Sequence, residues 1–293
     1  MESKKTIFAA VDLGPDTEKV LSYSVWLSQT LAEGPPEIYM LDVMDYALTP
    51  PAYLLPYMEK EEESCGQELK EWVGRLKRYG VAATGRIAVG RLIETFDNTL
   101  RDFPAAVLVL CHKSHIVRTS SSERLIKSLD VPMLVVRGGK ADSAVLGSVA
   151  VSNILCAVDF SEHSRKALEF ACSLAEKNSS SIIVTHVLSS LELDKSFDRL
   201  NNLSEADKQK YLNHAIHEAE ESMLSMTNIP DKAERTVKIG VPYKKINDIA
   251  SGRDIDLIVM GAQGASSTGG VLLGSIAEAV VKSAPCPVML VRK

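Results

Sequence analysis

The sequence repeats one pattern twice, and this duplication limits what the chain can fold into more than any other feature. The triplet Ala10-Val11-Asp12 recurs about 150 residues later as Ala157-Val158-Asp159. The run V-L-V-L at residues 107–110 recurs as L-I-V-M at residues 257–260. We therefore expect two copies of one domain, residues 1–138 and 153–293, joined by a linker at residues 139–152.

Within the second copy, strand-like runs alternate with helical patterns. Residues 164–177 place apolar side chains at helical spacing between β-rich runs at residues 154–158 and 182–187. Such alternation predicts an α/β fold in which helices cover both faces of a parallel sheet, the doubly wound type. Ligands of these folds bind beyond the carboxyl ends of the strands. The same analysis predicts helices starting near Ser204 and Ser275, a short helix over residues 246–250, and strands at residues 236–239, 257–260 and 288–291.

Composition excludes several classes of protein. A formal net charge of −5 and a pI near 5.8 argue against binding of nucleic acid, which relies on clustered Lys and Arg. The sequence has no run of about eighteen or more apolar residues that would cross a membrane. The five cysteines lack C-x-x-C spacing and are expected to be reduced core residues. We expect a cytoplasmic protein with neither nucleic acid nor a membrane as partner.

Five of the seventeen glycines fall within residues 261–274, between an expected strand and an expected helix. One interpretation is structural, because glycine permits positive φ angles in a long connection. The other is a phosphate cradle, in which bare backbone N–H groups converge on an anion. The unusual length of the connection favours the cradle. The stretch lacks the P-loop lysine, and no G-x-G-x-x-G occurs.

The helix after this stretch begins with Ser275-Ile276-Ala277-Glu278, which fits a capping box. This pattern predicts Ser275 as the N-cap and leaves N–H groups of the first turn facing the glycines. Those groups, together with the helix dipole, favour a phosphate. The carboxylate of Glu278 competes for the same positive helix end, so the capping box is equally typical of an ordinary stable helix.

The spacing G-x2-G-x9-G-[ST], formed by Gly261, Gly264, Gly274 and Ser275, resembles that of the ATP-binding members of the universal stress protein (UspA-like) family. The resemblance covers both halves of the chain. It implies five-stranded parallel sheets of strand order 3-2-1-4-5, bound ATP, and pairing of the two domains through their last strands. Asp159 could assist a Mg²⁺ ion that accompanies the ATP. The other matching segments are A-V-D at 157–159, H-V at 186–187, D-L-I-V-M-G at 256–261 and A-P-C-P-V at 284–288.

The resemblance also implies a set of nucleotide-binding residues. Asp159, preceded by Val158, would lie near the ribose and adenine, although Asp159 also suits a turn before a helix. Val187 would contact adenine through its backbone. Gln263 stands where many family members have histidine or arginine. Met260 and Gly261 would border the nucleoside, and Gly264, Gly274, Ser275, Ile276 and Ala277 would hold the phosphates.

The first half departs from this pattern. Its corresponding loop is shorter, and residues 111–119 contain no glycine, so positive φ would cost about 1–2 kcal/mol at each such position. We expect that the first half does not hold ATP in this manner, although Ser120-Ser121-Ser122-Glu123 still fits a capping box. Lys113 and Arg118 suit either another anion or an ordinary solvated loop. Aligned on the strands, Cys111, Ser114, Thr119 and Ser120 stand opposite Gly261, Gly264, Gly274 and Ser275.

Other candidate chemistry is incomplete. Cys111, His112 and His115 form one partial zinc pattern, and His214 with His217 forms another, but a structural zinc site needs four ligands. No nucleophile elbow G-x-S-x-G occurs. The glycine stretch offers backbone donors and no cationic clamp of the kind that phosphoryl transfer uses.

These features favour a nucleotide-binding regulatory protein of the stress response, in which ATP in the second domain acts as a conformational or association switch and not as a substrate. Two alternatives remain open at this point. One is a weak ATPase or phosphotransferase that uses the same pocket. The other is a scaffold that binds a small molecule or protein through the first domain. Pairing of the two domains within one chain and a homodimer are both compatible with the sequence.

Overall fold

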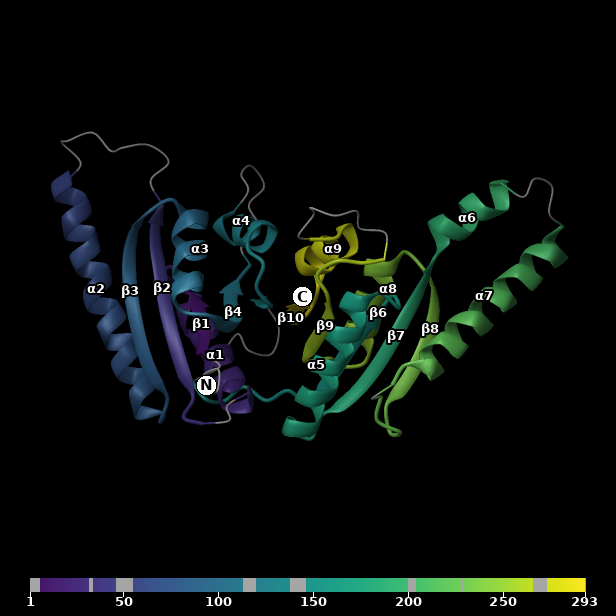
Figure 1. Ribbon diagram of the computed structural model, residues 1–293, viewed down its shortest axis with the longest axis horizontal. Helices are drawn as coiled ribbons and strands as arrows, with labels where there is room; N and C mark the ends of the chain where they lie inside the picture. Colours follow the sequence, from purple (N-terminus) through teal and green to yellow (C-terminus); the bar gives the residue numbers. More distant parts are fainter. Residues whose placement is uncertain are drawn as a thin grey trace. The chain divides into compact units, whose positions relative to one another are not determined.

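The computed structural model describes residues 6–31, 34–45, 55–112, 120–137, 146–199, 204–227, 229–265 and 273–292 (Figure 1). The chain divides into two compact units, Met1–Ala150 and Val151–Lys293. Residues 139–145 of the linker expected at residues 139–152 lie outside the described residues.

The first unit is a five-stranded sheet in which every described pairing is parallel, in the order β3-β2-β1-β4-β5. Strands and helices alternate along the chain, as the sequence pattern predicts. The elements are β1 (Thr6–Ala10), α1 (Thr17–Leu31), β2 (Glu37–Asp45), α2 (Leu55–Arg78), β3 (Ala82–Gly90), α3 (Leu92–Asp102), β4 (Ala105–Cys111), α4 (Ser121–Ser128) and β5 (Met133–Val136).

The second unit repeats this topology, with the strand order β10-β9-β6-β7-β8. The predicted fold class and strand order are therefore confirmed in both units. Helix α6 is an element that the sequence analysis did not identify. The elements are β6 (Asn153–Val158), α5 (Glu162–Asn178), β7 (Ser181–Ser189), α6 (Ser190–Arg199), α7 (Glu205–Ser225), β8 (Glu234–Gly240), α8 (Pro242–Gly252), β9 (Leu257–Gly261), α9 (Ser275–Ser283) and β10 (Val288–Val291).

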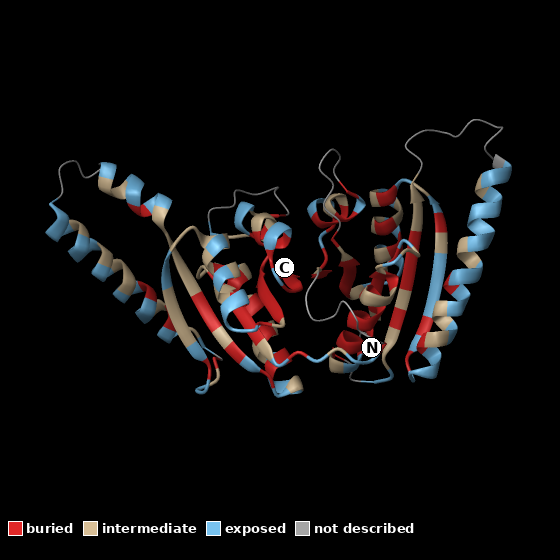
Figure 2. Ribbon diagram, turned by 180° about the vertical axis from the view of Figure 1, so that it is seen from behind, coloured by how far each residue is buried: buried red, intermediate tan, exposed pale blue. Residues whose placement is uncertain are grey.

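The cores lie along the central strands. Every residue of β9 is buried, and so is every residue of β5 and β10. Continuous apolar strands of this kind are stable only where helices cover both faces of the sheet. Figure 2 shows the burial concentrated on the inner strands, whereas α2 and α7 carry long exposed faces. No helix among the described residues is both long and apolar enough to span a membrane.

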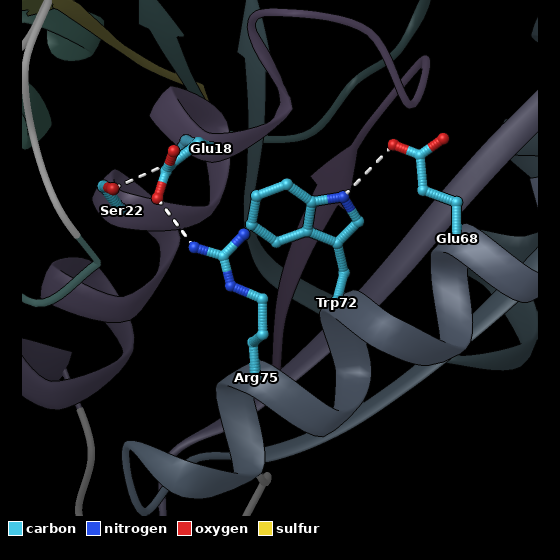
Figure 3. Close-up of polar contacts among 5 residues, drawn as sticks. All are labelled: Glu18, Ser22, Glu68, Trp72 and Arg75. Atoms are coloured by element: carbon cyan, nitrogen blue, oxygen red, sulfur yellow. Dashed lines mark hydrogen bonds and ion pairs between the residues drawn. The ribbon is translucent and has the colours of Figure 1, made fainter.

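A polar cluster fastens the long helix α2 to α1 in the first unit (Figure 3). Arg75 Nη2 on α2 lies 2.9 Å from Glu18 Oε1 on α1. The guanidinium carbon of Arg75 lies 4.1 Å from the ring centroid of Trp72, a cation–π arrangement. Trp72 Nε1 in turn donates to Glu68 Oε1 on the same helix. The indole is thus held between an arginine that pairs with α1 and a glutamate one turn away.

Candidate functional site

A cavity of about 280 Å³ opens in the second unit where β6, β7 and β9 end. This is the carboxyl edge of the sheet, where doubly wound folds place their ligands. The start of α9 and the first turn of α8 complete the lining. All of the residues predicted for nucleotide binding line this one cavity: Val158, Asp159, Val187, Met260, Gly261, Gln263, Gly264, Gly274, Ser275, Ile276 and Ala277.

The start of α9 differs from the sequence prediction in one respect. The N-cap is Gly274, at φ −73° and ψ 154°, and among the described residues no side-chain hydrogen bond caps the helix. The prediction of Ser275 as the N-cap of a capping box is therefore wrong. The physical reason is that the Gly274 N–H donates to Ala262 O at 2.8 Å, while Gly274 O accepts the first helical bond from Glu278 N at 2.9 Å. These two bonds start the helix one residue earlier.

With a glycine at the N-cap, the helix start has no N-cap side chain to bind the first N–H groups. Ser275, Ile276 and Ala277 form the first turn, whose N–H groups have no partner within an α-helix. The Oε1 atom of Glu278 lies 2.7 Å from Lys282 Nζ, one turn further along the helix. The cavity therefore meets an uncapped helix N-terminus, which carries partial positive charge.

The described glycines of this region serve close approach and not unusual backbone angles. A Cβ atom at Gly264 would lie 2.7 Å from Asp159 Oδ2, and one at Gly261 would lie 3.0 Å from the carbonyl carbon of His163. Neither these two glycines nor Gly274 has a positive φ. The interpretation based on positive φ is thus wrong for these three positions. Gly269 and Gly270 lie outside the described residues.

Asp159 connects the end of β6 to the segment that follows β9. Its Oδ1 accepts from Ser161 N–H at 3.1 Å and Ser161 Oγ at 2.6 Å, and its Oδ2 accepts from Ala265 N–H at 2.8 Å. Burial by itself would raise the pKa of Asp159, but the hydrogen bonds from Ser161 and Ala265 outweigh it and hold the pKa below its ordinary value. Asp159 is therefore a turn residue, and its carboxylate also holds the start of the glycine-rich stretch close to the end of β6.

Several lining residues were missed by the sequence analysis. The Thr185 hydroxyl is buried in the lining and has no hydrogen-bond partner among the residues that the structure describes. His186 Nδ1 lies 2.8 Å from Val158 O, and its ring packs on Phe160 at a centroid distance of 4.5 Å. Ile246 adds an apolar wall from α8. Thr185 and His186 directly precede Val187 in β7, so the strand pattern that placed Val187 at the cavity could also have placed these two residues there.

The two partial zinc patterns do not form metal sites among the described residues. No group of three or more His, Cys, Asp or Glu side chains gathers there in a way that could hold a metal ion. His214 and His217 lie exposed on α7, each 3.3 Å from a glutamate one turn along, Glu218 and Glu221. His115, from the other pattern, lies outside the described residues.

The corresponding helix in the first unit is capped. Ser120 is the N-cap of α4, and its Oγ accepts from Glu123 N–H at 3.2 Å, so the predicted start of this capping box is confirmed. The loop at residues 113–119, on which the expected loss of ATP binding depends, lies outside the described residues. That expectation stays a prediction.

Comparison with known proteins gives a consistent result. A family model described as the universal stress protein family matches residues 150–292. Half of the chain is 27% identical, over 158 residues, to 98% of a universal stress protein of Methanocaldococcus jannaschii. A further 142-residue match, at 31% identity, covers 97% of a universal stress protein of Thermus aquaticus and 47% of this chain. A crystal structure of a universal stress protein from Archaeoglobus fulgidus DSM 4304 shares the fold over 98% of this chain and 96% of its own, with a TM-score of 0.70 and 18% identity.

Proposed function

Because this chain belongs to the universal stress protein family, we propose that its second unit binds ATP and that the nucleotide acts there as a regulatory ligand. The observation that carries this proposal is the uncapped start of α9. The N–H groups of Ser275, Ile276 and Ala277 meet the cavity with no side chain of the described residues in the capping position. A triphosphate supplies the negative charge and the hydrogen-bond acceptors that such a helix end favours.

The shape of the lining supports the same assignment. Gly264 lets the Asp159 carboxylate lie against the backbone that follows β9, because a Cβ there would stand 2.7 Å from Asp159 Oδ2. The unpartnered Thr185 hydroxyl offers a hydrogen bond to a polar edge within the cavity. Ile246 and Met260 add apolar surface of the kind on which a flat base packs. We assign the phosphates to the start of α9 and the nucleoside to the ends of β6 and β7.

The chemistry of the lining favours binding over phosphoryl transfer. Phosphoryl transfer uses a cationic clamp, metal-binding carboxylates and a group that orients the nucleophile. Within the described part of the lining, Asp159 is the single carboxylate, and neither Lys nor Arg contributes. A Mg²⁺ ion would arrive with the triphosphate, since it is normally held by phosphate oxygens and one or two carboxylates. The proposed output is a change in conformation or association in a cytoplasmic stress-response protein, through pairing of units or of chains.

Substitution of Gly274 tests the proposal, because it should lower the affinity for ATP and leave the stability of the fold unchanged. Gly274→Asp adds a capping carboxylate that competes for the same N–H donors and repels phosphate. The added Cβ has room, since its nearest neighbour would be Ala262 O at 3.5 Å. We expect the variant to be as stable as the wild type while its affinity for MgATP, measured by calorimetry on the full chain, falls at least tenfold. Gly274→Ser should give an intermediate loss.

Gly252→Ala is the matched control, because a Cβ at Gly252 in α8 meets nothing within 4 Å. It should bind MgATP as the wild type does. Equal affinity of wild type and Gly274→Asp would refute the proposed site. A single-turnover experiment with radiolabelled ATP distinguishes ligand from substrate: recovery of intact ATP after prolonged incubation supports regulation, and stoichiometric release of ADP would contradict it.

A further inference from the structure

The first unit has a cavity of its own, of about 360 Å³, at the carboxyl ends of β1, β2 and β4 and beside the start of α4. Its place corresponds to that of the cavity in the second unit. Val11 and Asp12 line it after β1, just as Val158 and Asp159 line the other cavity after β6. The charge of the two linings is different.

The first difference is a buried carboxylate. Asp42 lies near the end of β2 and is 8% exposed. Asp42 follows Leu41, which pairs with Ala10 of β1. In the second unit His186 follows Thr185, which pairs with Ala157 of β6. Asp42 therefore occupies the position of a histidine that bonds to the backbone in the second unit.

The second difference is that Asp42 is not the only acid present. Asp12 and Asp16 line the same cavity, and no Lys or Arg does so among the described residues. Burial, together with the negative charge of Asp12, raises the pKa of Asp42 to about 6. A cation bound among these carboxylates would relieve that repulsion, whereas an anion would increase it.

The third difference is that a serine side chain caps the start of α4 in this unit. Ser120 Oγ accepts from Glu123 N–H and lies 2.9 Å from Ser122 Oγ. Both serines belong to the lining of the cavity. One backbone N–H group at the start of α4 is thus occupied by the Ser120 hydroxyl, whereas the N-cap of α9 makes no side-chain hydrogen bond.

An independent observation indicates a missing ligand. Thr17, at the start of α1, is 1% exposed and lines the cavity, and its Oγ1 has no hydrogen-bond partner within the described part of the chain. A buried hydroxyl without a partner costs about 1–3 kcal/mol, so native proteins rarely retain one without a reason. A ligand with N–H groups would provide the partner.

The remaining lining is apolar. Val20, Leu92 and Phe96 line the cavity, and each of them is buried. We propose that this cavity binds a small organic ammonium ion, whose charged head is held by Asp12 and Asp42 and whose hydrocarbon part packs on Leu92 and Phe96. The two units then bind ligands of opposite charge, a cation in the first and a nucleotide in the second.

The test uses 2-phenylethylammonium as the probe and neutral 2-phenylethanol as its near-isostere, titrated into the full chain by calorimetry at pH 7.5. We expect the ammonium ion to bind at least tenfold more tightly than the alcohol. Asp42→Asn should reduce ammonium affinity at least tenfold and leave affinity for the alcohol unchanged. Asp130→Asn, an exposed carboxylate of the same unit outside the lining, is the matched control and should bind like the wild type.

The outcomes separate this proposal from the ATP site. Asp42→Asn should bind MgATP as the wild type does, and Gly274→Asp should bind the ammonium ion as the wild type does. Equal affinity of the wild type for ammonium ion and alcohol would overturn the proposal. Equal affinity of wild type and Asp42→Asn for the ammonium ion would also overturn the proposal, because the negative charge of the carboxylates would then be neutralised by other groups of the chain.

Discussion

Replacement of Asp42 by Asn should stabilise the first unit, and by an amount that depends on pH. The folded-state pKa of about 6 lies above the ordinary aspartate value of 3.8. A difference of about two pKa units corresponds to about 3 kcal/mol, because each unit is worth about 1.4 kcal/mol. This is the free energy by which the ionised carboxylate disfavours the folded state in the absence of a bound cation.

The sign follows from proton binding. At a pH well below the ordinary pKa of 3.8, the Asp42 carboxyl is protonated in both the folded and the unfolded state, so it has no effect on the free energy of unfolding. Between pH 4 and 6 the folded state holds its proton more tightly, so the wild type loses stability as the pH rises. Above pH 6 the penalty is complete. The Asn side chain does not ionise, so Asp42→Asn escapes this loss.

Tryptophan fluorescence gives a selective assay. Both tryptophans of the chain, Trp26 and Trp72, lie in the first unit. Urea unfolding followed by their emission, without added amine, should show that the stability of Asp42→Asn relative to wild type is about 2–3 kcal/mol greater at pH 8 than at pH 4. Asp130→Asn should show no such pH-dependent gain. A difference between Asp42→Asn and wild type that stays constant with pH, or a loss of stability at pH 8, would refute the reasoning.

Two further predictions concern the second unit. Gly261→Ala should destabilise it by about 1–3 kcal/mol, because the new Cβ would lie 3.0 Å from the His163 backbone; thermal unfolding followed by circular dichroism tests this, and a melting temperature equal to that of Gly252→Ala would contradict it. Asp159→Asn should lose about 1 kcal/mol at pH 7, because the carboxylate accepts hydrogen bonds from Ser161 and Ala265. Since the folded-state pKa of Asp159 is lowered, this difference should shrink as the pH falls toward and through that pKa, and a difference that does not change with falling pH would argue against it.

The sequence by itself determined the fold class. Two copies of one alternating pattern predicted two α/β units, and apolar runs such as residues 257–260 predicted strands covered on both faces. These features are local periodicities, which a chain expresses without reference to distant residues. The glycine spacing also located the cavity of the second unit, because the close approach that a glycine allows is a property of that residue wherever it lies.

Only the tertiary structure decided the chemistry at each cavity. The N-cap position of α9 is held by Gly274 and not by Ser275, because the Gly274 N–H donates to Ala262 O. This contact depends on how the chain returns to the end of β9. The burial of Asp42 depends on the register of β2 against β1, which the triplet at residues 10–12 does not reveal. The unpartnered hydroxyl of Thr17 is likewise a property of its surroundings. Local pattern sets which elements form, but the charge and hydrogen bonding of a site are sums over elements far apart in the chain.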